Sequence, residues 1–281
     1  MFQINWKLKA VLYKLFEILK LKKSFYLIQK KITKRSLINI SKINKLWNFH
    51  YNSISKFDCK EILEIGAGKS LEQNIFLSYM LDNKINQTAI DITNMLDFDL
   101  FNEASKQIAK ILNKKEKGIV KNTSDLFNLY KIKYVAPHSL DELIKENKKF
   151  DICISTTALE HFKYDEILLF LSKLKKILLD KKLISAVIDY SDHYSHTDIN
   201  ISKLNYLSFT KEEWNKFNNF YLYQNRLRHQ DYRSLFIKNN YNLETEIKGN
   251  IIERPKKISN EFDINNDETF VSWGYFLIRG V

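Results

Sequence analysis

The sequence has little glycine, proline or cysteine, and each shortage narrows what the chain can be. Its 281 residues include six glycines, two prolines and two cysteines. Two cysteines, Cys59 and Cys153, provide neither a disulfide framework nor a Cys-x-x-Cys metal clip, so a reducing, cytoplasmic location is the default expectation. Glycine costs backbone entropy, so the pair Gly66 and Gly68 predicts a tight turn or a close approach of the backbone to a ligand.

Acidic residues are nearly absent from the first 57 residues, which carry 13 Lys/Arg and a single acid, Glu17. The rest of the chain carries 32 basic and 32 acidic residues, so the formal charge of +12 belongs to this segment. Such a segregated patch points to an anionic partner for residues 1–57, and leaves the remainder electrically balanced.

Long apolar runs are also missing from this basic segment. Residues 5–23 place apolar residues at helical spacing with lysines between them, which predicts a basic amphipathic helix. The lysines interrupt any window long enough to span a bilayer, and no apolar region precedes a small-residue cleavage site. We expect residues 1–57 to form a helical extension, including a helix at 37–47. Helix 5–23 either lies on an anionic membrane surface or packs on the body or a second subunit.

Residues 58–281 alternate between short apolar runs and amphipathic stretches. We expect strands at 61–65, 87–92, 132–136, 150–155, 183–189, 243–247 and 270–278, and helices at 70–81, 97–117, 166–179 and 230–239. The stretch 97–117 is expected to face solvent, and 190–229 is irregular. Strands alternating with helices predict an α/β domain with a Rossmann-like, doubly wound, mostly parallel seven-stranded sheet.

The glycine pair follows the first expected strand, and Asp91 ends the second. A nicotinamide dinucleotide site has a third glycine, where this chain has Leu71. Without that glycine a dinucleotide pyrophosphate is disfavoured, whereas a ligand without phosphates does not need it. A carboxylate at the end of the second strand suits a ribose diol. The pattern therefore favours a phosphate-free nucleoside ligand.

Over about residues 60–190 the chain resembles class I S-adenosylmethionine-dependent methyltransferases. Glu64–Gly68 is similar to the family's first motif, Asp91 to its ribose-binding acid, 150–155 to its fourth-strand motif and 158–161 to the segment that follows. A Pro-Gly-Gly loop that is common in the family is replaced here by residues 179–182. The resemblance implies a cofactor site formed by Glu64, Gly66, Ala67, Gly68, Asp91, Ile92, Ser139, Leu140, Ser155, Thr156 and Glu160.

A looser resemblance covers nearly the whole chain. The segments 188–193, 204–209 and 223–228, with Trp214 between the last two, are similar in order to methyltransferases found with bacterial surface-polysaccharide biosynthesis. This implies a sugar or glycan-linked acceptor and makes 190–229 an acceptor-side insertion. The residues we assign to acceptor binding are Tyr223, Asn225, Arg226, Arg228 and His196. Arginine forks suit phosphate, and the alternative is an ion pair with Asp231 or Glu213.

Methyl transfer to a hydroxyl needs alignment of donor and acceptor and benefits from a general base. His193 is our first choice, oriented by Asp189 or Asp192, with His161 second, because these residues follow the fourth and fifth strands. The alternatives are a structural hydrogen-bond cluster, or an Asp/Asp/His metal site as in catechol-type methyltransferases. We expect no metal, because no ligand geometry is visible in the sequence.

Two other functions remain open. A base-methylating enzyme typically has an Asn/Asp-Pro-Pro-aromatic clamp after strand four, where this chain has 155–158, Ser-Thr-Thr-Ala. RNA-binding signatures are also missing, which argues against a nucleic-acid methyltransferase. The other alternative is a non-catalytic, cofactor-binding scaffold peripheral to the inner face of a membrane.

Overall fold

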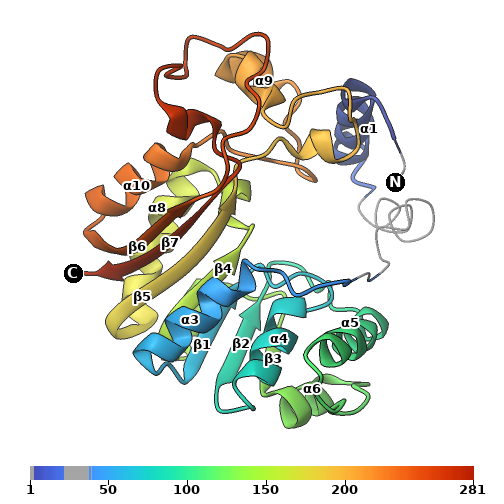
Figure 1. Cartoon of the computed structure of the whole chain (residues 1–281), viewed down its shortest axis with the longest axis vertical. Helices are drawn as coiled ribbons and strands as arrows, with labels where there is room; N and C mark the ends of the chain where they lie inside the picture. Colours follow the sequence, from blue (N-terminus) through green and yellow to red (C-terminus); the bar gives the residue numbers. More distant parts are fainter. Residues whose placement is uncertain (1–2, 22–37, 39) are drawn as a thin grey trace.

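The computed structural model describes residues 3–21, 38 and 40–281 (Figure 1). Seven strands form one sheet in the order β3-β2-β1-β4-β5-β7-β6. They are β1 Glu61–Ile65, β2 Asn86–Ile90, β3 Ile132–Val135, β4 Phe150–Thr156, β5 Leu178–Asp189, β6 Tyr241–Lys248 and β7 Trp273–Gly280. All neighbours are parallel except β7, which runs antiparallel to β5 and β6. The predicted Rossmann-like, mostly parallel seven-stranded sheet is confirmed.

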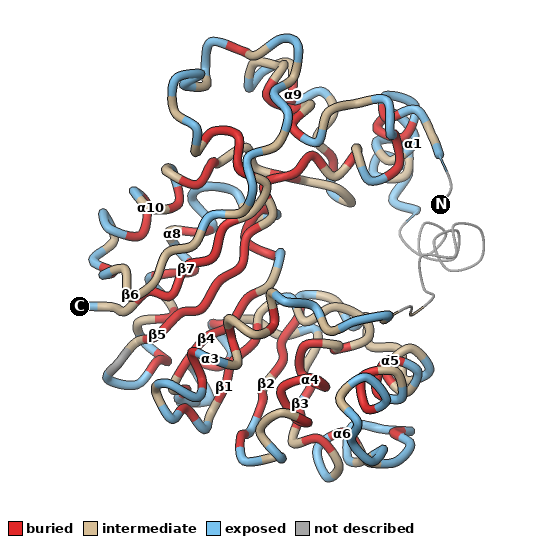
Figure 2. Tube along the Cα trace, viewed as in Figure 1, coloured by how far each residue is buried: buried red, intermediate tan, exposed pale blue. Residues whose placement is uncertain are grey.

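Helices cover both faces of this sheet. The helices of the described chain are α1 Trp6–Ile18, α3 Trp47–Phe57, α4 Glu72–Met80, α5 Phe98–Ile111, α6 Thr123–Tyr130, α7 Leu140–Lys145, α8 Tyr164–Ile177, α9 Lys211–Asn215 and α10 His229–Lys238. Short 3-10 turns lie at Leu159–His161, His193–His196, Asn205–Ser208 and Asp267–Phe270. One apolar core lies between the sheet and α3, α4, α5 and α6, and a second lies between it and α7, α8 and α10. Figure 2 shows the buried strands running between these layers.

Several element predictions need correction. The expected helix at 37–47 falls partly outside the described residues. Its described part, 40–46, is not helical, and the helix begins at Trp47 instead. Helix α5 does not face solvent throughout, since it buries Phe101, Ala104 and Ile108. Two short helices, α6 and α7, were not predicted, because neither is long enough to show a clear period.

The N-terminal segment is not one unit. Helix α3 packs on the sheet through Trp47 and Ile54, so it belongs to the body and the expected boundary at 57 is wrong. Helix α1 packs elsewhere, through Trp6 and Ala10, on an aromatic core that includes Trp214. Trp214 is 2% exposed and is therefore a core residue. Within the described ranges, no helix combines the length and apolarity needed to cross a membrane.

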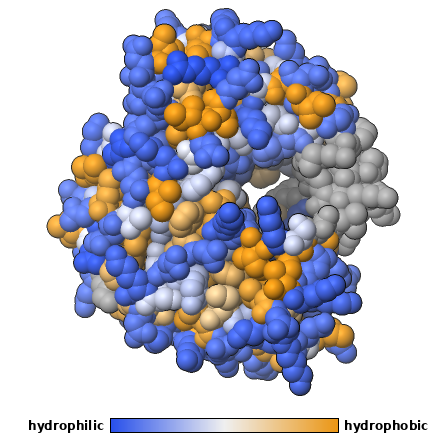
Figure 3. Space-filling view, in the orientation of Figure 1, coloured by the Kyte–Doolittle hydropathy of each residue, from blue (hydrophilic) through white to orange (hydrophobic). Residues whose placement is uncertain are grey.

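Segment 190–229 and the chain before β7 form the upper part of the molecule, above the carboxyl ends of the strands (Figure 1). Asp198 accepts a hydrogen bond from the Trp6 backbone N–H at 2.9 Å, and Lys9 donates to Thr197 at 3.0 Å. Figure 3 shows the surface hollowed between this part and the sheet. In a doubly wound sheet, ligands bind beyond the carboxyl ends of the strands, which is the edge facing this hollow.

Candidate functional site

The glycine turn at the end of β1 has a backbone that only glycine adopts easily. Gly66 and Gly68 both have φ of +76°. A Cβ built on Gly66 would lie 2.8 Å from the Cβ of Ala158, whereas one on Gly68 would meet nothing within 4 Å. Strand β1 pairs with β4, so the turn lies against the loop that follows β4. Gly66 is thus required by close packing as well as by φ, and Gly68 by φ alone.

Glu64, one residue before the end of β1, lies behind the turn. Its side chain is 3% exposed and accepts hydrogen bonds from Gln73, at 3.0 Å, and from Asn74. Burial raises the pKa of Glu64 to about 8, against a smaller opposing effect of Asn74. The family resemblance implies that Glu64 faces the cofactor, and the structure instead places its side chain in the layer between β1 and α4. It stabilises the turn from below.

Thr156 belongs to the same buried network. Its hydroxyl donates to Gln73 and lies 2.8 Å from Nε2 of His50 on α3, whose Nδ1 lies 2.8 Å from the Ser185 hydroxyl. Burial lowers the pKa of His50 to about 3, so the imidazole is neutral. No motif marks His50 or Gln73, and sequence reasoning missed both. Only the packing of α3 on β4 and β5 brings His50 into this network.

Asp91 directly follows β2 and is 8% exposed. One carboxylate oxygen accepts the backbone N–H of Thr93 at 3.2 Å, and its carbonyl accepts that of His138 at 2.9 Å. Strands β1 and β2 pair in parallel, so Asp91 stands beside the glycine turn. Ile92, 78% exposed, projects from the same edge. Asp91 and Ile92 therefore lie at the edge of the sheet that carries the glycine turn.

Ser139 and Leu140, two further residues of the expected cofactor site, make local contacts. Ser139 caps α7, with its hydroxyl and backbone N–H both bonded to Glu142 at 2.9 and 2.7 Å. Leu140 is 9% exposed and packs in the core with Leu63 and Ile90. Ser155, at the end of β4, is fully buried, and its hydroxyl has no partner among the described residues.

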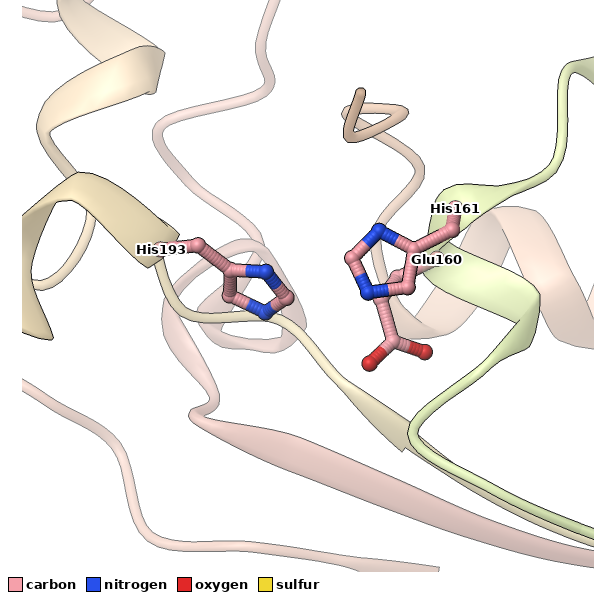
Figure 4. Close-up of side chains that lie close together, drawn as sticks. All are labelled: Glu160, His161 and His193. Carbon is pink, nitrogen blue, oxygen red and sulfur yellow. The ribbon is translucent and has the colours of Figure 1, made fainter. Parts of the chain in front are cut away.

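Two histidines and a glutamate converge beyond the ends of β4 and β5, which are neighbours in the sheet (Figure 4). Glu160 and His161 come from the 3-10 turn after β4, and His193 begins the one after β5. One potential metal-binding atom from each side chain, an imidazole nitrogen or a carboxylate oxygen, lies within 4.8 Å of the corresponding atoms of the other two. The His161 and His193 rings are 5.0 Å apart, and His193 stacks on His196 at 5.1 Å.

Of the two aspartates offered as partners for His193, the structure selects Asp189. Its carboxylate lies 3.5 Å from Nε2 of His193. Burial by itself would raise the pKa of Asp189. The neighbouring His193 outweighs this effect, so the pKa of Asp189 lies below its ordinary value. Asp192 is completely buried and caps its own turn, accepting the Tyr194 N–H at 2.8 Å and the Asn205 amide at 2.9 Å. The expectation that Asp192 assists catalysis is corrected: it shapes the loop.

Arg228 is also corrected. It is completely buried, and its guanidinium donates to the carbonyls of Tyr190, Thr269 and Val271 at 2.7–2.9 Å and to the Tyr206 hydroxyl. Four of its five N–H groups are used in this way and the side chain is completely buried, so Arg228 ties the insertion to the segment before β7. Neither alternative pairing of its guanidinium, with Asp231 or Glu213, is found in the structure.

The remaining expected acceptor residues lie around the histidines. Asn225 donates to the carbonyls of Leu159 and Phe162 at 3.0 and 2.9 Å and so holds the turn that carries His161. The Tyr223 carbonyl lies 2.7 Å from Nδ1 of His161. Arg226 pairs with Glu261 at 2.6 Å. Tyr223, Asn225 and Arg226 line a hollow of about 560 Å³, together with Lys163, Tyr164, Asp165, Lys211, Trp214, Asn215, Asn218, Gln224, Leu227, Glu261 and Phe262.

No family model matches the chain, and no curated protein matches it. Among solved structures, it is similar to the methyltransferase domain of a bacterial Hen1, with 15% identity and a TM-score of 0.42 over 84% of this chain and 97% of that one. It is also similar to a SAM-dependent methyltransferase from Archaeoglobus fulgidus, with 14% identity and a TM-score of 0.44 over 83% and 92%. A putative O-methyltransferase from Nostoc punctiforme matches with 10% identity and a TM-score of 0.46 over 82% and 55%. Likenesses of this size leave function to be argued from the site.

Proposed function

We propose that this protein is an S-adenosylmethionine-dependent methyltransferase that O-methylates a sugar or glycan precursor. The observation that carries the proposal is the common edge of the sheet. The glycine turn after β1, Asp91 after β2 and the histidine cluster after β4 and β5 all lie there. The proposed donor site and the proposed proton acceptor thus lie at the same edge of the sheet.

The residues present fit the cofactor. The glycine turn is open at Gly68, where an added Cβ would meet nothing within 4 Å, and Asp91 offers a carboxylate to a ribose diol at the next strand. When bound, S-adenosylmethionine supplies a methyl group carried on a positively charged sulfur. Gly66, Gly68, Asp91 and Ile92 would hold it, while Glu64 and Thr156 fix the turn from beneath.

The acceptor hydroxyl must lose its proton, because a protonated alcohol is a poor nucleophile. His193 lies at the cleft with Asp189 behind it at 3.5 Å. A carboxylate in this position orients the imidazole and stabilises its protonated form. We therefore assign the proton-accepting role to His193, with His161 beside it.

The hollow next to the cluster supports the choice of acceptor. It carries the cationic side chains of Lys163, Lys211 and Arg226, the last paired with Glu261, together with Asp165 and several aromatic and amide groups. Cations favour a phosphate-bearing molecule, and aromatic faces suit a sugar ring. A nucleotide sugar or a lipid-linked glycan combines both features. We place the acceptor's phosphate in this hollow and its reacting hydroxyl at His193.

Calorimetry with S-adenosylhomocysteine tests the donor half, and the absence of binding would overturn the proposal. A methyl-donor consumption assay against nucleotide sugars, lipid-linked glycans and RNA tests the acceptor half. Turnover on a phosphorylated glycan, with a several-fold higher KM in Lys211→Gln, is the expected result. Turnover only on RNA would assign the protein to the nucleic-acid class instead.

Helix α1 supports a membrane-surface location. It packs through Trp6, Lys9 and Ala10, while Leu8, Val11, Leu15, Ile18 and Leu19 remain 48–67% exposed in a stretch that also carries Lys7, Lys14 and Lys20. Apolar residues flanked by lysines suit an anionic bilayer. Co-sedimentation with anionic vesicles, lost on neutral vesicles and in Leu15→Glu/Ile18→Glu, is expected. Equal recovery with and without anionic lipid would refute this location.

A further inference from the structure

The histidine cluster contains a carboxylate that the fold leaves without a partner. Glu160 is 1% exposed, and neither of its oxygens has a hydrogen-bond partner among the described residues. A buried polar group without a partner costs free energy, so a native chain keeps one only for a reason.

The two histidines supply what the carboxylate lacks. Nδ1 of His161 lies 2.7 Å from the Tyr223 carbonyl and must donate to it, which places the free lone pair on Nε2. A backbone carbonyl that fixes the tautomer in this way is typical of histidines that bind metals through the other nitrogen. Figure 4 shows this ring and the carboxylate of Glu160 converging with His193.

His193 is held by its surroundings as a ligand should be. Asp189 lies 3.5 Å from its Nε2, and the ring stacks on His196. The loop that carries it is fixed by Asp192, and the loop that carries His161 is fixed by Asn225. The three side chains thus come from rigid turns at the ends of adjacent buried strands, and both turns have their own hydrogen-bonded supports.

We propose that Glu160, His161 and His193 bind a divalent transition-metal cation. Two imidazoles and one carboxylate, with the remaining positions open, suit cations such as Zn²⁺, Mn²⁺ or Fe²⁺. The cation neutralises the Glu160 carboxylate and leaves room for an oxygen ligand from the cleft.

The consequence for chemistry rests on the proposed function. A hydroxyl bound to a divalent cation is more acidic than a free one, so the cation assists the deprotonation that the acceptor needs. His193 then acts as a ligand in the loaded protein, where the hydroxyl proton passes to solvent water, and as the proton acceptor only in the metal-free one. Metal binding itself does not depend on this role and is measured without any acceptor.

The test is titration of the metal-stripped full chain with Mn²⁺, following loss of the free-ion signal by electron paramagnetic resonance. One saturable site per chain is expected, and Glu160→Gln and His193→Ala each weaken it at least tenfold. The matched control is Glu146→Gln. His138 lies 3.4 Å from Glu146 and 3.6 Å from Glu142, but these side chains form no convergent trio. This control is expected to bind Mn²⁺ like the wild type.

Absence of saturable binding, or wild-type affinity in Glu160→Gln, overturns the proposal. Thermal unfolding shows whether each variant folds. If Glu160→Gln does not fold, His193→Ala serves as the test, because His193 is only half-buried. Calorimetry with S-adenosylhomocysteine on the same samples separates the two ideas. Cofactor binding without Mn²⁺ binding removes the metal site alone, and Mn²⁺ binding without cofactor binding removes the proposed function alone.

Discussion

Replacing each glycine of the turn by alanine separates two physical effects at one site. Gly66 and Gly68 share a φ of +76°, so an alanine at either position pays the strain of a left-handed backbone, about 1–2 kcal/mol. Only Gly66→Ala also drives a Cβ to 2.8 Å from Ala158. Overpacking of this kind typically costs about 1–3 kcal/mol. We expect a free energy of unfolding lower by about 2–5 kcal/mol in Gly66→Ala and about 1–2 kcal/mol in Gly68→Ala.

The collision partner provides the internal control. In Gly66→Ala/Ala158→Gly the two Cβ atoms no longer meet, so the double variant should recover the overpacking part and retain the backbone strain. Urea unfolding of the wild type, Gly66→Ala, Ala158→Gly and the double variant gives the coupling free energy between the two positions. We expect this coupling to favour the double variant by about 1–3 kcal/mol. In calorimetry, Gly66→Ala should bind S-adenosylhomocysteine more weakly than Gly68→Ala does, because the proposed cofactor site is built on this turn. Equal destabilisation by the two glycine variants, or a coupling free energy near zero, would refute the packing argument.

Three further predictions concern Asp91, Glu64 and Arg228. Asp91→Asn should weaken S-adenosylhomocysteine binding by 10- to 100-fold in calorimetry, since charge-assisted hydrogen bonds to a ribose contribute about 1.5–3 kcal/mol, and unchanged affinity would remove Asp91 from the site. Folding raises the pKa of Glu64 from 4.5 to about 8. Its contribution to stability is therefore full below pH 4.5 and is lost as the pH rises to 8, by up to about 1.4 kcal/mol per pH unit. Urea unfolding of Glu64→Gln at several pH values should lack this loss. Parallel pH profiles of the wild type and Glu64→Gln would contradict the assignment. Arg228→Met should lower the free energy of unfolding by about 3–5 kcal/mol, because it leaves three buried carbonyls without a donor, and a midpoint shift in urea smaller than that of Gly68→Ala would show that Arg228 is not a structural tie.

The donor half of the site could be predicted from sequence because its signals are local. Gly66 and Gly68 are two of six glycines, and Asp91 ends an apolar run, so each is marked by its immediate neighbours. Parallel pairing then brings the ends of β1 and β2 to one edge without further information. What the sequence could not show is which way a side chain faces within a strand that is buried on both sides. Glu64 therefore appeared to face the cofactor when it faces α4.

The acceptor half depends on pairings between distant segments, which one sequence does not reveal. Arg226 and Arg228 look alike two residues apart, yet one lines a hollow with Glu261 and the other is completely buried. The difference lies in residues 190–206 and 269–271, which supply the carbonyls and the hydroxyl around Arg228. Likewise Asp189 and Asp192 are equally good candidates by spacing, and only the fold of the loop turns Asp192 inward as a cap.

The histidine cluster shows why the side chains of the proposed metal site could not be grouped from the sequence alone. Sequence proximity grouped Asp189, Asp192 and His193 as the candidate metal set. The actual neighbours of His193 are Glu160 and His161, which belong to the adjacent strand because β4 and β5 pair in parallel. Residues that follow neighbouring parallel strands meet whatever their separation in sequence, so the convergence follows from the strand order. The unpartnered Glu160 is the observation that favours the proposed metal site over a hydrogen-bond cluster, because a structural cluster would satisfy its own carboxylate.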